Sequence, residues 1–206
     1  MSLFKIKTLV NWLVYRLIRP HRGGHGIHSP FLYQFVNQVL YNKLVNKSAR
    51  KETKNLSERY KTKYGRLFYK MSRYFRPKTI VVVGTNSAAA YFKAGISNTN
   101  IIEIEADNLY GNRLQSALDE VKTFDFLYVD CNVMNDDVMS VFFQSSLYSG
   151  NSSVIIFDNI CANEGVWKAW QEICSSEQVS VSLDLFTIGI VFFNEKLKKQ
   201  HFRLYY

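Results

Sequence analysis

The chain lacks a long apolar run. No stretch of its 206 residues approaches the roughly 20 consecutive apolar residues that a membrane-spanning helix needs. The segment Thr8–Ile18 is the sole candidate for a targeting signal, but Asn11 and Arg16 interrupt it and no small-residue cleavage site follows it. The sequence therefore predicts neither a transmembrane segment nor a secretory peptide.

Cysteine is scarce as well, with three residues in all. Cys131, Cys161 and Cys174 are an odd set without the spacing of a metal site, which disfavours a disulfide framework and a zinc site. This pattern is typical of a reduced, cytoplasmic protein. The apolar content of 47% and the aromatic content of 15% are sufficient for a full core and argue against disorder.

Acidic residues are nearly absent from residues 1–78, which hold 18 Lys and Arg against 2 acidic residues, a net charge of +16. Residues 79–206 hold 8 against 15, a net charge of −7. We interpret 1–78 as a helical, basic N-terminal extension or cap and 79–206 as an α/β domain.

Two stretches of this basic part have the apolar spacing of amphipathic helices, the second half of 43–78 and residues 4–19. We expect both to pack against the body of the protein, with membrane-surface contact by 4–19 as the alternative. The lysines and arginines are then either solvated helix faces or a weak binding surface for an anionic partner such as nucleic acid, a phosphorylated glycan or a membrane surface.

Four short apolar runs are present after residue 78. They are rich in Val and Ile with little alternation, which is typical of strands buried on both faces. The runs are 79–84, 101–105, 124–130 and 153–158, and the 21, 25 and 28 residues between their ends leave room for one crossover helix each. We predict a doubly wound, mostly parallel sheet of about six strands, completed by an antiparallel hairpin at about 179–185 and 187–194. We expect 79–84 and 153–158 to be parallel neighbours.

The carboxyl ends of these strands carry residues that could hold a ligand, as is usual in such sheets. Gly84 ends the first strand, where a glycine lets the backbone approach a bound group. The next helix, capped by Asn86 or Ser87, would offer free N–H groups to a negative ligand. Glu105 follows 21 residues later and is placed to accept hydrogen bonds from both hydroxyls of a ribose, although an exposed strand-end glutamate is the alternative.

Several segments together carry a resemblance to a known family. In chain order they are His25–Phe31, Tyr64–Pro77 leading into Thr79–Thr85, Glu105, Phe124–Asp130, Ile155–Ile160 with Trp167 and Trp170, and Asp184–Phe193. Over most of its length the chain resembles the class I S-adenosylmethionine-dependent methyltransferases, in particular the branch similar to catechol O-methyltransferase. The resemblance implies the Rossmann-like methyltransferase fold and transfer of a methyl group to a small or surface-presented hydroxyl or amine.

The resemblance also implies the contacts of the cofactor, S-adenosylmethionine. By match, Gly84 and Thr85 would line its methionine end, with Ser87 as a further contact. Glu105 would hold the ribose, and Asp130 would lie near the reacting centre.

A metal site and a catalytic pair follow from the same resemblance. Asp130, Asp158 and Asn159 match the residues that coordinate Mg²⁺ in the catechol-type branch, and three hard oxygen ligands on neighbouring strand ends suit this ion. Asp130 and Asp158 would be the catalytic residues, with the metal lowering the pKa of a substrate hydroxyl. A cap of the loop after the strand is the alternative role for Asp158 and Asn159. His25 and His28 would contact the substrate, or else shape a glycine-rich loop.

Three departures from the family pattern predict a degenerate cofactor site. Val82 stands where the family has an acidic residue, and Ala88 stands where it has a second glycine, so that a methyl group would crowd the cofactor. The segment 106–123 has room for one helix, roughly Leu114–Val121, and a strand and a helix of the family are then missing. The alternative function is therefore a catalytically silent methyltransferase-fold protein that acts as an interaction module for an anionic partner.

Overall fold

The computed structural model of the chain describes residues 4, 10, 13, 14, 17, 26–56, 63–84, 87–105, 113–134 and 137–206. The helices are α2 (Pro30–Phe35), the π-helix η2 (Val36–Leu40), α3 (Lys43–Glu52), α4 (Lys63–Phe75), α5 (Ser87–Gly95), α6 (Arg113–Val121), α7 (Cys131–Met134), α8 (Val138–Ser146) and α9 (Glu164–Ser175). The strands are β1 (Thr79–Val83), β2 (Asn100–Ile104), β3 (Phe124–Asp130), β4 (Ser149–Asp158), β5 (Val181–Asp184), β6 (Ile188–Phe192) and β7 (Gln200–Arg203).

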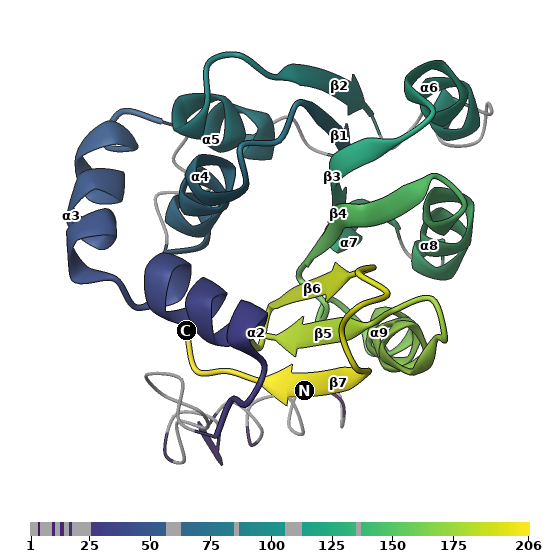
Figure 1. Cartoon of the computed structure of the whole chain (residues 1–206). Helices are drawn as coiled ribbons and strands as arrows, with labels where there is room; N and C mark the ends of the chain where they lie inside the picture. The colour runs from purple at the N-terminus through teal and green to yellow at the C-terminus, as the bar shows by residue number, and fades with distance from the viewer. Residues whose placement is uncertain are drawn as a thin grey trace.

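The seven strands of the described ranges form one sheet in the order β2-β1-β3-β4-β6-β5-β7 (Figure 1). Neighbouring strands are parallel except in the two pairs made by β6, which is antiparallel to β4 and β5. This confirms the mostly parallel α/β sheet with its antiparallel C-terminal hairpin. The expectation that 79–84 and 153–158 are neighbours is wrong, because β3 lies between β1 and β4.

Alternate residues of the central strands contribute to two separate apolar clusters. On β1, Ile80 and Val82 belong to one cluster, whereas Val81 and Val83 belong to the other. The first cluster includes residues of α2, η2, α4 and α5, and the second includes residues of α6, α7, α8 and α9, so helices cover both faces of the sheet (Figure 1). The unbroken apolar sequence of β1 follows from this arrangement, since neither of its faces meets water.

The helix predicted in the second half of 43–78 is α4, which packs on the first face of the sheet. Leu67, Phe68 and Met71 have no exposed area and belong to the first apolar cluster, with Ile80 and Val82 of β1. Two basic residues of the helix, Lys63 and Arg73, are exposed. A solvated basic face on a packed helix is therefore present in α4. Because this helix shares its core with the sheet, the domain boundary at residue 78 stays an interpretation.

We expected residues 4–19 to pack against the body of the protein, but most of the described residues of this stretch are exposed. Val10, Leu13, Val14 and Leu17 are helical and exposed, and Leu17 keeps 80% of its surface accessible. Phe4, by contrast, is partly buried, so packing of residues 4–19 against the body of the protein stays a prediction. Among the described residues, no helix has the length and apolar character that would let it cross a membrane. The cytoplasmic location stays a prediction.

The two edges of the sheet also bear on the sequence predictions. β2 is the edge strand on one side, and between β2 and β3 the described residues 113–123 hold one helix, α6, close to the predicted Leu114–Val121. At the other edge, β7 adds a strand that the sequence did not predict. Its four residues alternate between half-buried and exposed positions, so no apolar run in the sequence indicates this strand.

Candidate cofactor site at the carboxyl ends of the strands

The register of the parallel strands brings the predicted strand-end residues to one edge of the sheet. Val83 pairs with Ile104 on one side and with Val129 on the other, so Gly84 lies between the positions of Glu105 and Asp130. The backbone N–H of Gly84 donates to the carbonyl oxygen of Ile104 at 2.8 Å, which extends the pairing to the glycine. Asp130 is in turn the direct partner of Asp158.

Gly84 makes a close approach that no other residue type could make without movement. Its φ of +112° lies in a region that L side chains rarely adopt. A β-carbon at this position would lie 2.7 Å from the β-carbon of Asp130 and 3.1 Å from a methyl carbon of Val133. The end of β1 therefore packs directly on the end of β3, and Gly84 is buried there.

A hydrogen-bonded network holds the ends of β3 and β4. The carboxylate of Asp130, which has no exposed area, accepts from both the backbone N–H and the side-chain amide of Asn132, at 3.1 and 2.8 Å. The side-chain amide of Asn159 donates to the Asn132 carbonyl oxygen at 2.5 Å. Asn132 thus links two of the predicted site residues and fixes the orientation of the Asp130 carboxylate.

A tyrosine of the neighbouring strand β3 orients Asp158, and a second tyrosine lies near it. The Tyr128 hydroxyl donates to its Oδ2 at 2.6 Å. The hydroxyl of Tyr64, at the start of α4, donates to the Leu185 carbonyl oxygen at 3.4 Å. Burial raises the pKa of Tyr64 to about 12, and the nearby Asp158 carboxylate adds to this rise. Tyr64 is therefore a neutral hydrogen-bond donor at physiological pH.

Cys161 is a thiol close to these groups, but it is not an activated nucleophile. Its Sγ donates to the Phe186 carbonyl oxygen at 3.1 Å. Burial, followed by the negative charge of Asp184, raises its pKa to about 12, so the thiolate is not populated at neutral pH.

Sequence reasoning missed Tyr128, Tyr64 and the linking role of Asn132. Tyr128 precedes Asp130 by two residues in a strand, so the two side chains share one face, and this spacing could have identified it. No local pattern indicates Tyr64, because its position beside β5 depends on how α4 packs.

The structure describes only some of the remaining predicted site residues. Glu105 is exposed immediately after β2, and Ser87 is the first residue of α5. Thr85 and His25 lie outside the described residues. His28 is exposed two residues before α2. In the described part of the chain, no hydrogen bond or ring contact joins it to the strand ends, and its role as a substrate contact stays a prediction.

The donor set proposed for Mg²⁺ comprises two carboxylates and one amide. Asp130 and Asp158 are direct strand partners, but each carboxylate already accepts a hydrogen bond from a protein donor. Within the described ranges, no group of three or more His, Cys, Asp or Glu side chains is arranged to hold a metal ion. The residues fit the ion only in part, so the metal site stays a prediction and no step of the proposed reaction relies on it.

The packing of α5 corrects the expectation that the methyl group of Ala88 crowds the cofactor. Ala88 has no exposed area and belongs to the apolar cluster on the first face of the sheet, together with Val82. Its methyl group therefore fills the core instead of crowding an open cofactor space. Val82 is 1% exposed in the same cluster, so a carboxylate at this position would be buried among apolar groups.

The geometry fits S-adenosylmethionine at one half of the edge. The buried Gly84 and the exposed carboxylate of Glu105 lie side by side at the ends of β1 and β2, and this carboxylate could accept hydrogen bonds from the hydroxyls of a ribose. Gly84 packs against the buried Asp130, whose carboxylate is held by Asn132.

No protein-family model and no curated protein matches the sequence. Solved structures do match. A candidate caffeoyl-CoA O-methyltransferase of Staphylococcus aureus has a TM-score of 0.53 and 12% identity over 79% of this chain and 97% of its own. A methyltransferase of Podospora anserina, bound to S-adenosylhomocysteine, has a TM-score of 0.50 and 13% identity over 74% of this chain and 88% of its own.

The MycE methyltransferase of the mycinamycin biosynthetic pathway, in complex with Mg and S-adenosylhomocysteine, has a TM-score of 0.51 and 11% identity. That match covers 73% of this chain and 50% of MycE. Identities of this size establish the fold alone. The chain has the Rossmann-like α/β fold of the S-adenosylmethionine-dependent methyltransferases, O-methyltransferases among them.

Proposed function

We propose that the protein is an S-adenosylmethionine-dependent methyltransferase that acts on a hydroxyl or amine acceptor, either a small molecule or a group presented on a surface. The observation that carries this proposal is the exposed carboxylate of Glu105 at the end of β2, beside the left-handed turn at Gly84 that follows the adjacent strand β1.

Each residue of the edge has a role in this proposal. Glu105 accepts hydrogen bonds from the ribose hydroxyls, and Gly84 permits the left-handed turn after β1, beside which the methionine part of the cofactor would lie. The cofactor supplies a methyl group on a sulfonium, which an acceptor oxygen or nitrogen attacks. Asp158, which is partly exposed, accepts the proton of the acceptor at its carboxylate. Asp130 is fully buried, so it acts by positioning the loop through Asn132.

Glu105→Ala should weaken the binding of S-adenosylhomocysteine by roughly 10- to 150-fold, because a charge-assisted hydrogen bond contributes about 1.5–3 kcal/mol. Isothermal titration calorimetry measures this change. Glu103→Ala is the matched control, since Glu103 is also an exposed carboxylate of the same strand, two residues earlier. The control should bind with the affinity of the natural protein. Equal affinities in all three proteins would contradict the role of Glu105.

The alternative is a catalytically silent protein that keeps the fold and interacts with an anionic partner. The exposed basic residues of α4 favour it. The same titration separates the two functions. A natural protein that binds neither S-adenosylmethionine nor S-adenosylhomocysteine cannot be a methyltransferase of this type.

A further inference from the structure

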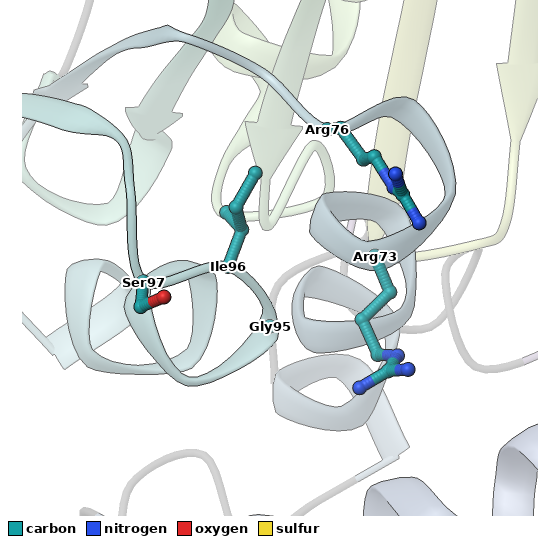
Figure 2. A pocket seen from close by; sticks show the side chains of 5 residues that line it. All are labelled: Arg73, Arg76, Gly95, Ile96 and Ser97. Carbon is teal, nitrogen blue, oxygen red and sulfur yellow. The ribbon is translucent and has the colours of Figure 1, made fainter.

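A pocket lies at the opposite end of the sheet from the candidate cofactor site. It has a volume of about 330 Å³ and is lined by Arg73, Arg76, Gly95, Ile96 and Ser97 (Figure 2). The arginines come from the end of α4 and the residue after it. The other three residues, the last of α5 and the two that follow it, face them across the pocket. Because β1 and β2 begin shortly after these helices, the pocket lies near the amino ends of the strands.

A glycine brings the two helices close enough to form this pocket. A β-carbon at Gly95 would lie 2.5 Å from the Tyr69 carbonyl oxygen and 2.7 Å from the β-carbon of Ser72. The end of α5 therefore rests directly on the backbone of α4. This contact fixes the separation of Ser97 from the arginines, so the pocket is built into the packing of the two helices.

Arg76 occupies a backbone conformation that favours glycine. Its φ is +51°, and its N–H donates to the Ser72 carbonyl oxygen at 2.9 Å, which closes the end of α4. Glycine is the usual residue at such a position because a β-carbon is disfavoured there. The sequence nevertheless has an exposed arginine. A side chain that is retained against the backbone preference is a candidate for function.

The charge around the pocket is positive. None of its five lining residues is acidic. The ion pairs of the described residues involve Lys168, Lys199 and Arg203, and neither Arg73 nor Arg76 takes part in them. Arg73 is in contact with the Tyr69 hydroxyl at 3.4 Å, and its guanidinium lies 5.9 Å from the centre of that ring. The ring contact restrains Arg73, and its charge has no acidic partner among the described residues.

From these observations we propose that the pocket binds a phosphate group of a small anionic ligand. Two guanidinium groups offer planar pairs of N–H donors that match phosphate oxygens, and the Ser97 hydroxyl adds a donor from the other side. The volume of about 330 Å³ and a lining without aromatic side chains favour a small ligand over nucleic acid, since strands of nucleic acid are bound along basic grooves with stacking aromatic side chains. This site is independent of the proposed methyl transfer.

Inorganic pyrophosphate is the probe for the test, titrated into the full chain at low ionic strength and followed by calorimetry. We expect binding that weakens about tenfold or more in the double variant Arg73→Gln, Arg76→Gln, because charge-assisted hydrogen bonds are lost. The matched control is Lys47→Gln, Lys51→Gln, which removes the same charge from exposed positions of α3 and should leave the affinity within about twofold.

A second double variant, Arg73→Lys, Arg76→Lys, separates binding from a role in helix stability. Cations near the end of a helix stabilise it, and lysine does this as well as arginine. The lysine variant should keep the thermal stability of the natural protein but bind pyrophosphate several-fold more weakly, since lysine lacks the planar pair of donors. Inorganic phosphate and a short single-stranded oligonucleotide, as further probes, should bind more weakly than pyrophosphate.

Three results would overturn the proposal. They are the absence of pyrophosphate binding to the natural protein, unchanged binding in the glutamine variant, and an equal loss in the α3 control. Tighter binding of the oligonucleotide than of pyrophosphate would also overturn it, because the ligand would then be a nucleic acid.

Discussion

Gly84→Ala should lower the free energy of unfolding by roughly 2–5 kcal/mol, as the combined effect of backbone strain and overpacking. The strain arises because φ at this position is +112°. The overpacking arises because the added methyl group would lie 2.7 Å from the β-carbon of Asp130, which has no exposed area. Urea unfolding followed by circular dichroism measures the change. The variant should also lose affinity for S-adenosylhomocysteine, since the methyl group displaces the end of β3.

Gly150→Ala is the matched control for this substitution. Its nearest neighbour would be the Thr123 hydroxyl oxygen at 3.7 Å, an ordinary contact distance, and no unusual φ is present there. The control should change stability by less than about 0.5–1 kcal/mol, the usual effect on a strand of exchanging glycine and alanine. Equal stabilities of the two variants would contradict the close packing of Gly84 on Asp130.

A second large effect is expected from Lys70, a lysine buried in α4. It is 1% exposed, and its Nζ donates to the Asn46 side-chain oxygen at 2.8 Å and to the Leu40 carbonyl oxygen at 3.3 Å. The ammonium also lies 4.8 Å from the centre of the Tyr206 ring. Burial, followed by repulsion from Arg66, lowers the pKa of Lys70 to about 7 from its usual 10.5.

Stability should therefore rise with pH between about 7 and 10. In this window the unfolded chain holds a proton on Lys70 that the folded protein has released, so raising the pH favours the folded state. Below pH 7 both states are protonated and the full cost of the buried charge is present. The change across the window is on the order of 4 kcal/mol. Above pH 10 the raised pKa values of the buried Tyr64 and Tyr206 act in the opposite direction.

The measurement is urea unfolding of the natural protein and of Lys70→Met at pH 6.5, 8 and 9.5. Methionine keeps much of the length of the side chain but carries no proton, so the difference in unfolding free energy between the two proteins should change by several kcal/mol across this range, roughly as expected from the shift. Lys93→Met, on the exposed surface of α5, is the control and should show a constant difference. A constant difference for Lys70→Met as well would contradict the assigned pKa.

The sequence was sufficient to predict which segments form the central strands. Thr79–Val83 and Phe124–Asp130 are continuous apolar runs because helices cover both of their faces, and this burial leaves a strong sequence signal. Burial on both faces also explains why the order of the strands could not be predicted. A strand that is apolar on both faces does not specify its neighbour. Gln200–Arg203 was missed because an edge strand that is half exposed has no such run.

The candidate site was predictable to the extent that it depends on topology. Parallel strands end at one edge, so Gly84, Glu105, Asp130 and Asp158 had to gather there. The position of Ala88 was misjudged because the rotation of α5 about its axis decides which face of the helix meets the core, and a turn motif does not define that rotation. The hydrogen bonds of Asn132 and Tyr128 depend on side-chain geometry and could not be read from the sequence.

The central claim is that the edge formed by β1, β2 and β3 binds S-adenosylmethionine. A crystal structure of the protein grown with saturating S-adenosylhomocysteine tests it most directly. The account predicts that both ribose hydroxyls lie within hydrogen-bonding distance of the Glu105 carboxylate and that the methionine part lies against Gly84. An empty edge at saturating ligand, or a ligand bound elsewhere on the protein, would contradict it.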